Sequence, residues 1–90
     1  MNVDGGTQNA ASWEQFVDIE LSRSSGFLTV AMNDRASGKV AAASREELSA
    51  HRAYQEALHL FRVLRRHMRQ TGARRLALRI KEIDNAMHGV

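Results

Sequence analysis

The sequence predicts a small α+β domain, in which a short antiparallel β-meander of two or three strands precedes a long amphipathic helix and a second, C-terminal helix. Three observations indicate this fold class. Apolar residues alternate with others near the N-terminus, clusters of Gly and Ser divide the first half into short segments, and a helix-capping motif followed by helical periodicity marks the second half. We expect residues 1–12 to form a flexible tail and residues 13–90 to form one domain.

The first predicted strand covers residues 15–21. Every second position is apolar, which is the period of a strand with one face in water. These apolar residues are Val17, Ile19 and Leu21, and they alternate with Phe16, Asp18 and Glu20. A short helix is the alternative, because Ser12 and Gln15 stand at capping-box spacing.

Two further strands are predicted at residues 27–32, which are rich in β-branched and aromatic side chains, and more weakly at residues 39–43. Turn-forming residues separate them, in the segments 22–26 and 33–38. A two-stranded ribbon alone is marginally stable in water, so we expect residues 15–21 to add the third strand.

The long helix is predicted to begin at Ser44. Ser44 and Glu47 form an S-x-x-E capping box, in which the hydroxyl and the carboxylate each accept a hydrogen bond from a free backbone N–H group. The helical periodicity continues from there, with one apolar face and one charged face. Gly72 is the expected residue just after the helix.

The last segment is predicted to be a helix as well. Its apolar residues recur at spacings of four, three and four, which is typical of a helix that packs along one seam. They are Leu76, Ile80, Ile83 and Met87. A strand is the alternative for this element, because Leu76, Leu78 and Ile80 alternate with Arg75, Ala77 and Arg79.

Length and composition place the chain among small single domains. Ninety residues support one modest core, and the absence of Cys removes disulfides and Cys-based metal sites. A reducing compartment is compatible with this composition, so we expect a cytoplasmic protein. Residues 1–12 lack the basic start and apolar run of a signal peptide, and no stretch approaches the ~20 apolar residues of a transmembrane helix.

The charge distribution is the most informative functional feature. Between Ala57 and Lys81 the chain has eight Lys or Arg residues and no Asp or Glu, whereas residues 1–56 have five basic and eight acidic side chains. A block of uncompensated positive charge attracts an anionic partner. Most of these cations are Arg, whose planar guanidinium suits bidentate contacts with phosphate.

These features predict a small non-catalytic binding module that docks an anionic partner through an Arg-rich helical surface. Nucleic acid is the expected partner, although the pattern does not distinguish DNA from RNA, and an acidic protein surface is a further candidate. The candidate anion-binding residues are Arg62, Arg66, Arg69, Arg74, Arg75 and Arg79.

A homodimeric protein–protein interaction module with no nucleic-acid role is the alternative. Several large apolar residues lie outside the predicted core faces and need a partner to cover them. They are Trp13, Phe16, Leu60, Val63 and Leu78. In this interpretation the arginines pair with acidic residues of a second copy, and the candidates are Glu14, Asp18 and Glu20.

No catalytic, cofactor or metal site is predicted. The chain has no G-x-S-x-G, H-E-x-x-H or phosphate-loop motif. His51, His59 and His67 are eight residues apart, which on a helix separates neighbouring imidazoles by about 12 Å and prevents them from sharing one ion.

Overall fold

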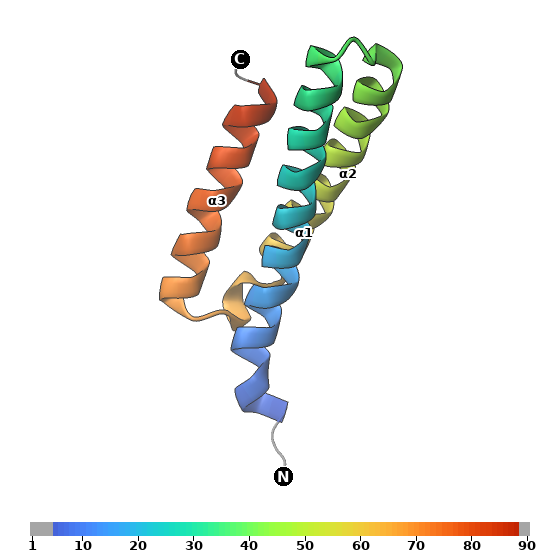
Figure 1. Cartoon of the computed structure of the whole chain (residues 1–90). Coiled ribbons are helices and arrows are strands. Elements are labelled where there is room, and N and C mark those ends of the chain that lie inside the picture. Colours follow the sequence, from blue (N-terminus) through green and yellow to red (C-terminus); the bar gives the residue numbers. More distant parts are fainter. Residues whose placement is uncertain (1–4, 89–90) are drawn as a thin grey trace.

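The structure, a computed structural model, describes residues 5–88, and these form three α-helices in a bundle (Figure 1). Helix α1 spans Gly5–Ala36, α2 spans Val40–Leu64 and α3 spans Gln70–His88. A single turn of 3-10 helix, η1, at Arg65–His67 lies between α2 and α3. The helices α1 and α2 form a long antiparallel hairpin, and α3 lies along one side of it.

The hairpin turn depends on one glycine. Gly38 has a φ of +82°, in the left-handed region that a residue without Cβ adopts at no steric cost. The N–H of Gly38 donates to the carbonyl of Arg35 at 3.1 Å, and the N–H of Lys39 donates to the carbonyl of Asp34 at 2.8 Å. These two bonds form a Schellman motif, which ends α1. Helix α2 then begins at Val40, two residues after Gly38.

Small side chains line the contact between α1 and α2. Ser24 and Ala31 from α1 are buried, and so are Ala43, Ala50 and Ala57 from α2. The Ser24 hydroxyl donates a 2.9 Å hydrogen bond to the carbonyl of Ala50, which fixes the register of the hairpin. Because each set recurs every seven residues, one side of each helix remains at the seam along its length.

The larger core residues lie where α3 covers the hairpin. Leu76 and Ile83 of α3 pack with Leu21 of α1 and Phe61 of α2 in the buried cluster. Ile80 and Met87 are partly buried against the same cluster, so the seam predicted for the last segment is confirmed, as is its helical structure. The strand alternative for this segment is wrong.

The predicted α+β fold is wrong, because the described residues contain no strand. Residues 15–21 and 27–32 lie within α1, and residues 39–43 lie at the start of α2. The apparent alternation arose from Ile19, which is 50% exposed, whereas Val17 and Leu21 are buried four residues apart on one helical face. Residues 5–12 of the expected tail also belong to α1, and residues 1–4 lie outside the described part.

The predicted limits of the long helix also need correction. Ser44 is an exposed residue inside α2, which begins four residues earlier, at Val40. The helix ends at Leu64, and after η1 the extended backbone of Met68 reverses the direction of the chain. Gly72 therefore lies in the first turn of α3 and does not follow a helix end.

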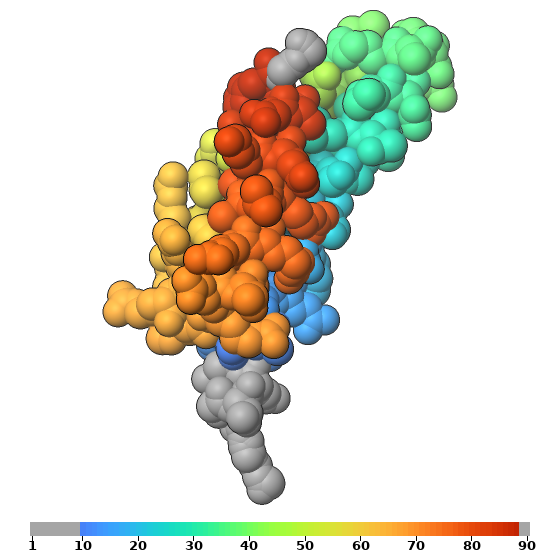
Figure 2. All heavy atoms as spheres, turned by 90° about the vertical axis from the view of Figure 1, so that its left-hand side faces the viewer, coloured from blue at the N-terminus to red at the C-terminus, as the bar shows by residue number. Residues whose placement is uncertain are grey.

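The molecule is elongated, with Cα extents of 53 × 24 × 16 Å. Figure 2 shows α3 lying over the α1–α2 hairpin, with the turn of the hairpin projecting beyond one end of α3. None of the described helices has both the length and the apolar character that crossing a lipid bilayer requires.

Candidate functional site

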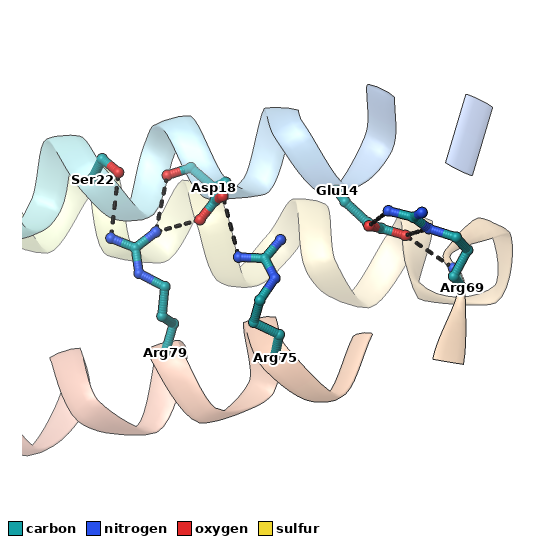
Figure 3. Close-up of polar contacts among 6 residues, drawn as sticks. All are labelled: Glu14, Asp18, Ser22, Arg69, Arg75 and Arg79. Atoms are coloured by element: carbon teal, nitrogen blue, oxygen red, sulfur yellow. Dashed lines mark hydrogen bonds and ion pairs between the residues drawn. The ribbon is translucent and has the colours of Figure 1, made fainter. Parts of the chain in front are cut away.

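The candidate arginines divide into two groups in the structure. Arg69, Arg75 and Arg79 form ion pairs with acidic residues of α1 (Figure 3). Among side chains of residues 10–88, no acidic residue lies within ion-pair distance of the other three, Arg62, Arg66 and Arg74, all of which are exposed. The six predicted arginines therefore do not form one free basic surface, because three of them pair with acidic residues of α1 within the chain.

Arg69 holds the start of α3 against α1. The Glu14 carboxylate accepts hydrogen bonds from the backbone N–H of Arg69 at 3.0 Å, from its Nε at 3.1 Å and from a terminal guanidinium nitrogen at 2.6 Å. The side chain of Glu14 is only 4% exposed. These hydrogen bonds hold the pKa of Glu14 below its usual value despite the opposing effect of burial, and they raise the pKa of Arg69.

Gly72 makes room for this contact. A Cβ atom placed on Gly72 would overlap the Glu14 carboxylate, at distances that folded proteins do not show. The glycine is therefore required by close approach, not by a helix end.

Arg75 and Arg79 form a second contact between α1 and α3. Both pair with the Asp18 carboxylate, Arg75 at 3.3 Å and Arg79 more closely. Arg79 also donates to the carbonyl of Asp18 at 3.4 Å and to the Ser22 hydroxyl at 3.3 Å. Glu14, Asp18 and Glu20 are the acids that we expected to meet the arginines of a second copy. The structure pairs all three with arginines of their own chain, Glu20 with Arg23 at 3.4 Å.

A hollow of about 410 Å³ lies beside the exposed arginines, where η1 meets α3. Arg65 and Arg74 border it, and Met68, Ala73 and Ala77 contribute to its lining. The guanidinium of Arg65 lies 5.7 Å from the centre of the Phe61 ring, which is a cation–π distance. Sequence periodicity did not place Arg65 in the candidate site, because the prediction continued a regular helix through this position.

A second hollow, of about 430 Å³, lies where the C-terminal end of α3 meets the hairpin. Its lining includes Ser44, Glu47 and His51 of α2. Ser44 and His51 are about 10 Å apart along the helix axis, and the carboxylate between them is bound by Arg35 at 2.7 Å. This order places the acid, not the imidazole, next to the hydroxyl, so the three residues do not form a serine nucleophile with its base.

Two carboxyl groups meet near the hairpin turn. Desolvation raises the pKa of Glu46, and the hydrogen bond and negative charge of Asp34 raise it further. One carboxyl oxygen of Glu46, Oε1, is buried without a hydrogen-bond partner among the described residues. In the described part of the chain no three His, Cys, Asp or Glu residues are grouped closely enough to bind a metal ion.

The side of the hairpin that faces away from α3, which we term the outer face, has both apolar and charged residues. Phe16, Val30 and Val63 are each about half exposed, at 50%, 46% and 52%. Trp13 and Phe16 form an aromatic pair, with their ring centres 5.7 Å apart. Of the apolar residues expected to need a partner, Phe16, Val63 and Leu78 are exposed, whereas Leu60 packs against the core.

Four charged residues occupy the middle of the outer face. Glu20 and Arg23 from α1, with Arg52 and Glu56 from α2, border one shallow depression of about 360 Å³. The contact between Ser24 and Ala50 sets the register of the two antiparallel helices, so Arg23 lies near the level of Arg52, and Glu20 lies about equally far along the axis from Glu56 and from Arg52. Glu20 and Arg23 form an ion pair within α1, at 3.4 Å.

No protein-family model, curated protein or solved structure matches this chain.

Proposed function

We propose that this chain is a non-catalytic, self-associating protein–protein interaction module that uses the outer face of the α1–α2 hairpin. The observation that carries the proposal is the half-exposure of large apolar side chains at both ends of this face, Phe16 and Val63 at one end and Val30 at the other. Apolar side chains grouped on a two-helix face are typical of a surface that another protein covers.

The pairing of the arginines supports this function over nucleic-acid binding. Arg69, Arg75 and Arg79 already have carboxylate partners within the chain, so binding a phosphate through them would require those ion pairs to break. Nucleic-acid binding through Arg62, Arg66 and Arg74 stays a prediction, with fewer phosphate contacts than the six arginines would offer.

Mass measurement over a range of concentrations tests the proposal. In light scattering coupled to size exclusion, the chain should move from one copy towards two as its concentration rises from about 10 µM to 1 mM, the range of weak association. Val63→Glu should hold it at one copy, because it places a charge among apolar side chains at the interface. Leu78→Glu is the matched control, since Leu78 is 64% exposed on α3, away from the outer face, and its replacement should leave the mass unchanged.

A single-copy mass at every concentration would overturn self-association. A salt-sensitive gel shift with an oligonucleotide that is lost on charge reversal at Arg62 and Arg66 would favour nucleic-acid binding instead.

A further inference from the structure

We infer that the hollow between η1 and α3 is a binding site for a small phosphate monoester with an apolar body, and that Arg65 and Arg74 hold the phosphate. The inference goes beyond the proposed self-association and does not depend on it. The hollow is lined by η1 and α3, whereas the outer face is the side of the hairpin that faces away from α3.

The hollow forms where the chain reverses direction between α2 and α3. Met68 has extended backbone there, and its N–H donates to the carbonyl of Arg65 at 3.0 Å. The Glu14 carboxylate fixes the start of α3, because it binds both the backbone N–H and the guanidinium of Arg69. Both walls of the hollow are therefore held by contacts within the chain, so a ligand does not have to order them when it binds.

The charge around the hollow is positive and uncompensated. Arg65 and Arg74 line it, and neither has an acidic side chain within ion-pair distance among residues 10–88. Residues 57–81 contain no Asp or Glu, and Glu14, the acid that α1 places at the start of α3, is already bound by Arg69. The charge of the hollow therefore favours an anionic ligand.

The polar groups of the hollow suit phosphate better than carboxylate. A guanidinium presents N–H donors in a planar fork, and a phosphate monoester offers three strong acceptor oxygens. The phosphate also has close to two negative charges at pH 7, which matches two arginines, whereas a carboxylate has one. Gln70, whose amide group is a further donor, lines the same hollow.

Arg65 is partly positioned before a ligand arrives. Its guanidinium lies 5.7 Å from the centre of the Phe61 ring. This cation–π contact restricts the side chain without neutralising its charge. Less side-chain freedom is therefore lost when the guanidinium binds an anion.

The size and the apolar lining of the hollow indicate that the phosphate belongs to a small molecule with an apolar part. The volume of about 410 Å³ lies within the range of small-molecule sites, roughly 300–1,000 Å³. Met68, Ala73 and Ala77 contribute apolar surface, which an inorganic phosphate ion would leave in contact with water. The short side chains of the two alanines leave room for an apolar group against α3.

Titration with phenyl phosphate tests the inference. In calorimetry at pH 7 and low salt, a single molecule should bind to each copy with a Kd below about 1 mM. The backbone amide resonances of Met68, Ala73 and Ala77 should shift during the titration. Inorganic phosphate, which has no apolar part, and benzoate, which has one charge, should each bind at least about fivefold more weakly.

Substitutions at the hollow test the roles of its residues. Arg65→Met and Arg74→Met should each weaken the binding of phenyl phosphate about tenfold, because each removes one charged donor. Arg45→Met is the matched control, since Arg45 is exposed about 30 Å from Arg65 along the helix axis, and it should leave the affinity unchanged. Ala77→Glu places a carboxylate at an exposed position of the lining, and it should abolish binding in a chain whose circular dichroism is unaltered.

Three outcomes would overturn the site. They are equal losses from Arg65→Met and Arg45→Met, which indicate a general attraction of anions; no binding of phenyl phosphate by the folded chain; and binding only to vesicles that contain phosphatidic acid, a lipid with the same phosphate group. Each of these leaves self-association standing, because mass is measured separately. A chain that stays single at all concentrations removes self-association and leaves this site standing.

Discussion

Glu14 and Arg69 are separated by 55 positions in the chain, yet a single carboxylate accepts both the backbone N–H and the guanidinium of that arginine. The contact joins the first helix to the residue that precedes α3. It fixes where the third helix begins, because the backbone N–H at a helix start has no partner within the helix.

Gly72→Ala should destabilise the protein by about 2 kcal/mol, because the added methyl group overlaps the Glu14 carboxylate and forces it to move. Chemical denaturation followed by circular dichroism measures this change. Gly26→Ala is the matched control, since Gly26 lies in α1 with open space around it, and there alanine should stabilise the helix by about 0.5–1 kcal/mol. Equal effects of the two substitutions would contradict the close contact at Gly72.

Stability should fall in acid in a way that depends on Glu14. The pKa of Glu14 is lowered in the folded protein, so its ionised form stabilises the fold at pH values above the unfolded value of 4.5, and this contribution disappears as the pH falls through the folded pKa. Glu14→Gln should cost about 1.5 kcal/mol at pH 7 and flatten the acid limb of the stability profile. Urea unfolding at intervals between pH 3 and pH 7 compares the two proteins, and parallel profiles would argue against the proposed role of Glu14.

Glu46 should have the opposite pH dependence. Its pKa is raised in the folded protein, so the protonated form is favoured by folding, and the stabilisation present below the unfolded pKa is lost as the pH rises through the folded pKa. Glu46→Gln should therefore make the protein more stable at pH 7. Thermal unfolding at neutral pH measures the gain, and Glu47→Gln, which removes the ion pair with Arg35, should give no such gain.

Arg79→Met should lower the stability by about 0.5–1 kcal/mol, because it removes the hydrogen bonds of Arg79 with Asp18 and Ser22, although the groups remain partly exposed. Arg62→Met should stay within about 0.5 kcal/mol of the original protein, since Arg62 is exposed and has no ion pair with residues 10–88. Paired denaturation curves test the contrast. A larger loss at Arg62 would show that the division of the arginines is incorrect.

The C-terminal helix could be predicted from the sequence, whereas for the N-terminal helix the sequence indicated only a short segment, the helical alternative for residues 15–21. In α3 the residues Leu76, Ile80 and Ile83 are large, and they repeat with a helical period on one face. In α1 the buried positions include Ser24 and Ala31, while Ile19 and Val30 face solvent. Apolar residues therefore occur on every side of α1, which hides its helical period. The segment that contains Ser24 and Gly26 also has the composition of a turn, and only the packing of α2 explains why Ser24 is buried.

The end of α2 at Leu64 could not be predicted from local sequence either. Leu64 is not followed by Gly or Pro, so local propensity favours a continuous helix up to Gly72. Because the helix is interrupted between Leu64 and Gln70, Arg69 immediately precedes α3, and there its backbone N–H donates to Glu14. Tertiary contact overrides helix propensity here. The ion pairs of the arginines also join residues that are far apart in the sequence, so local patterns identify the arginines and do not show which of them have carboxylate partners.

The composition of the hairpin seam has a consequence for synthesis on the ribosome. Alanine and serine bury little apolar area, so α1 and α2 alone leave the larger side chains Leu21 and Phe61 without their cover. That cover comes from Leu76 and Ile83 in the 19-residue α3. The core of a nascent chain therefore closes only after Ile83 has been synthesised, and until then the side chains of Leu21 and Phe61 lack the apolar partners that bury them.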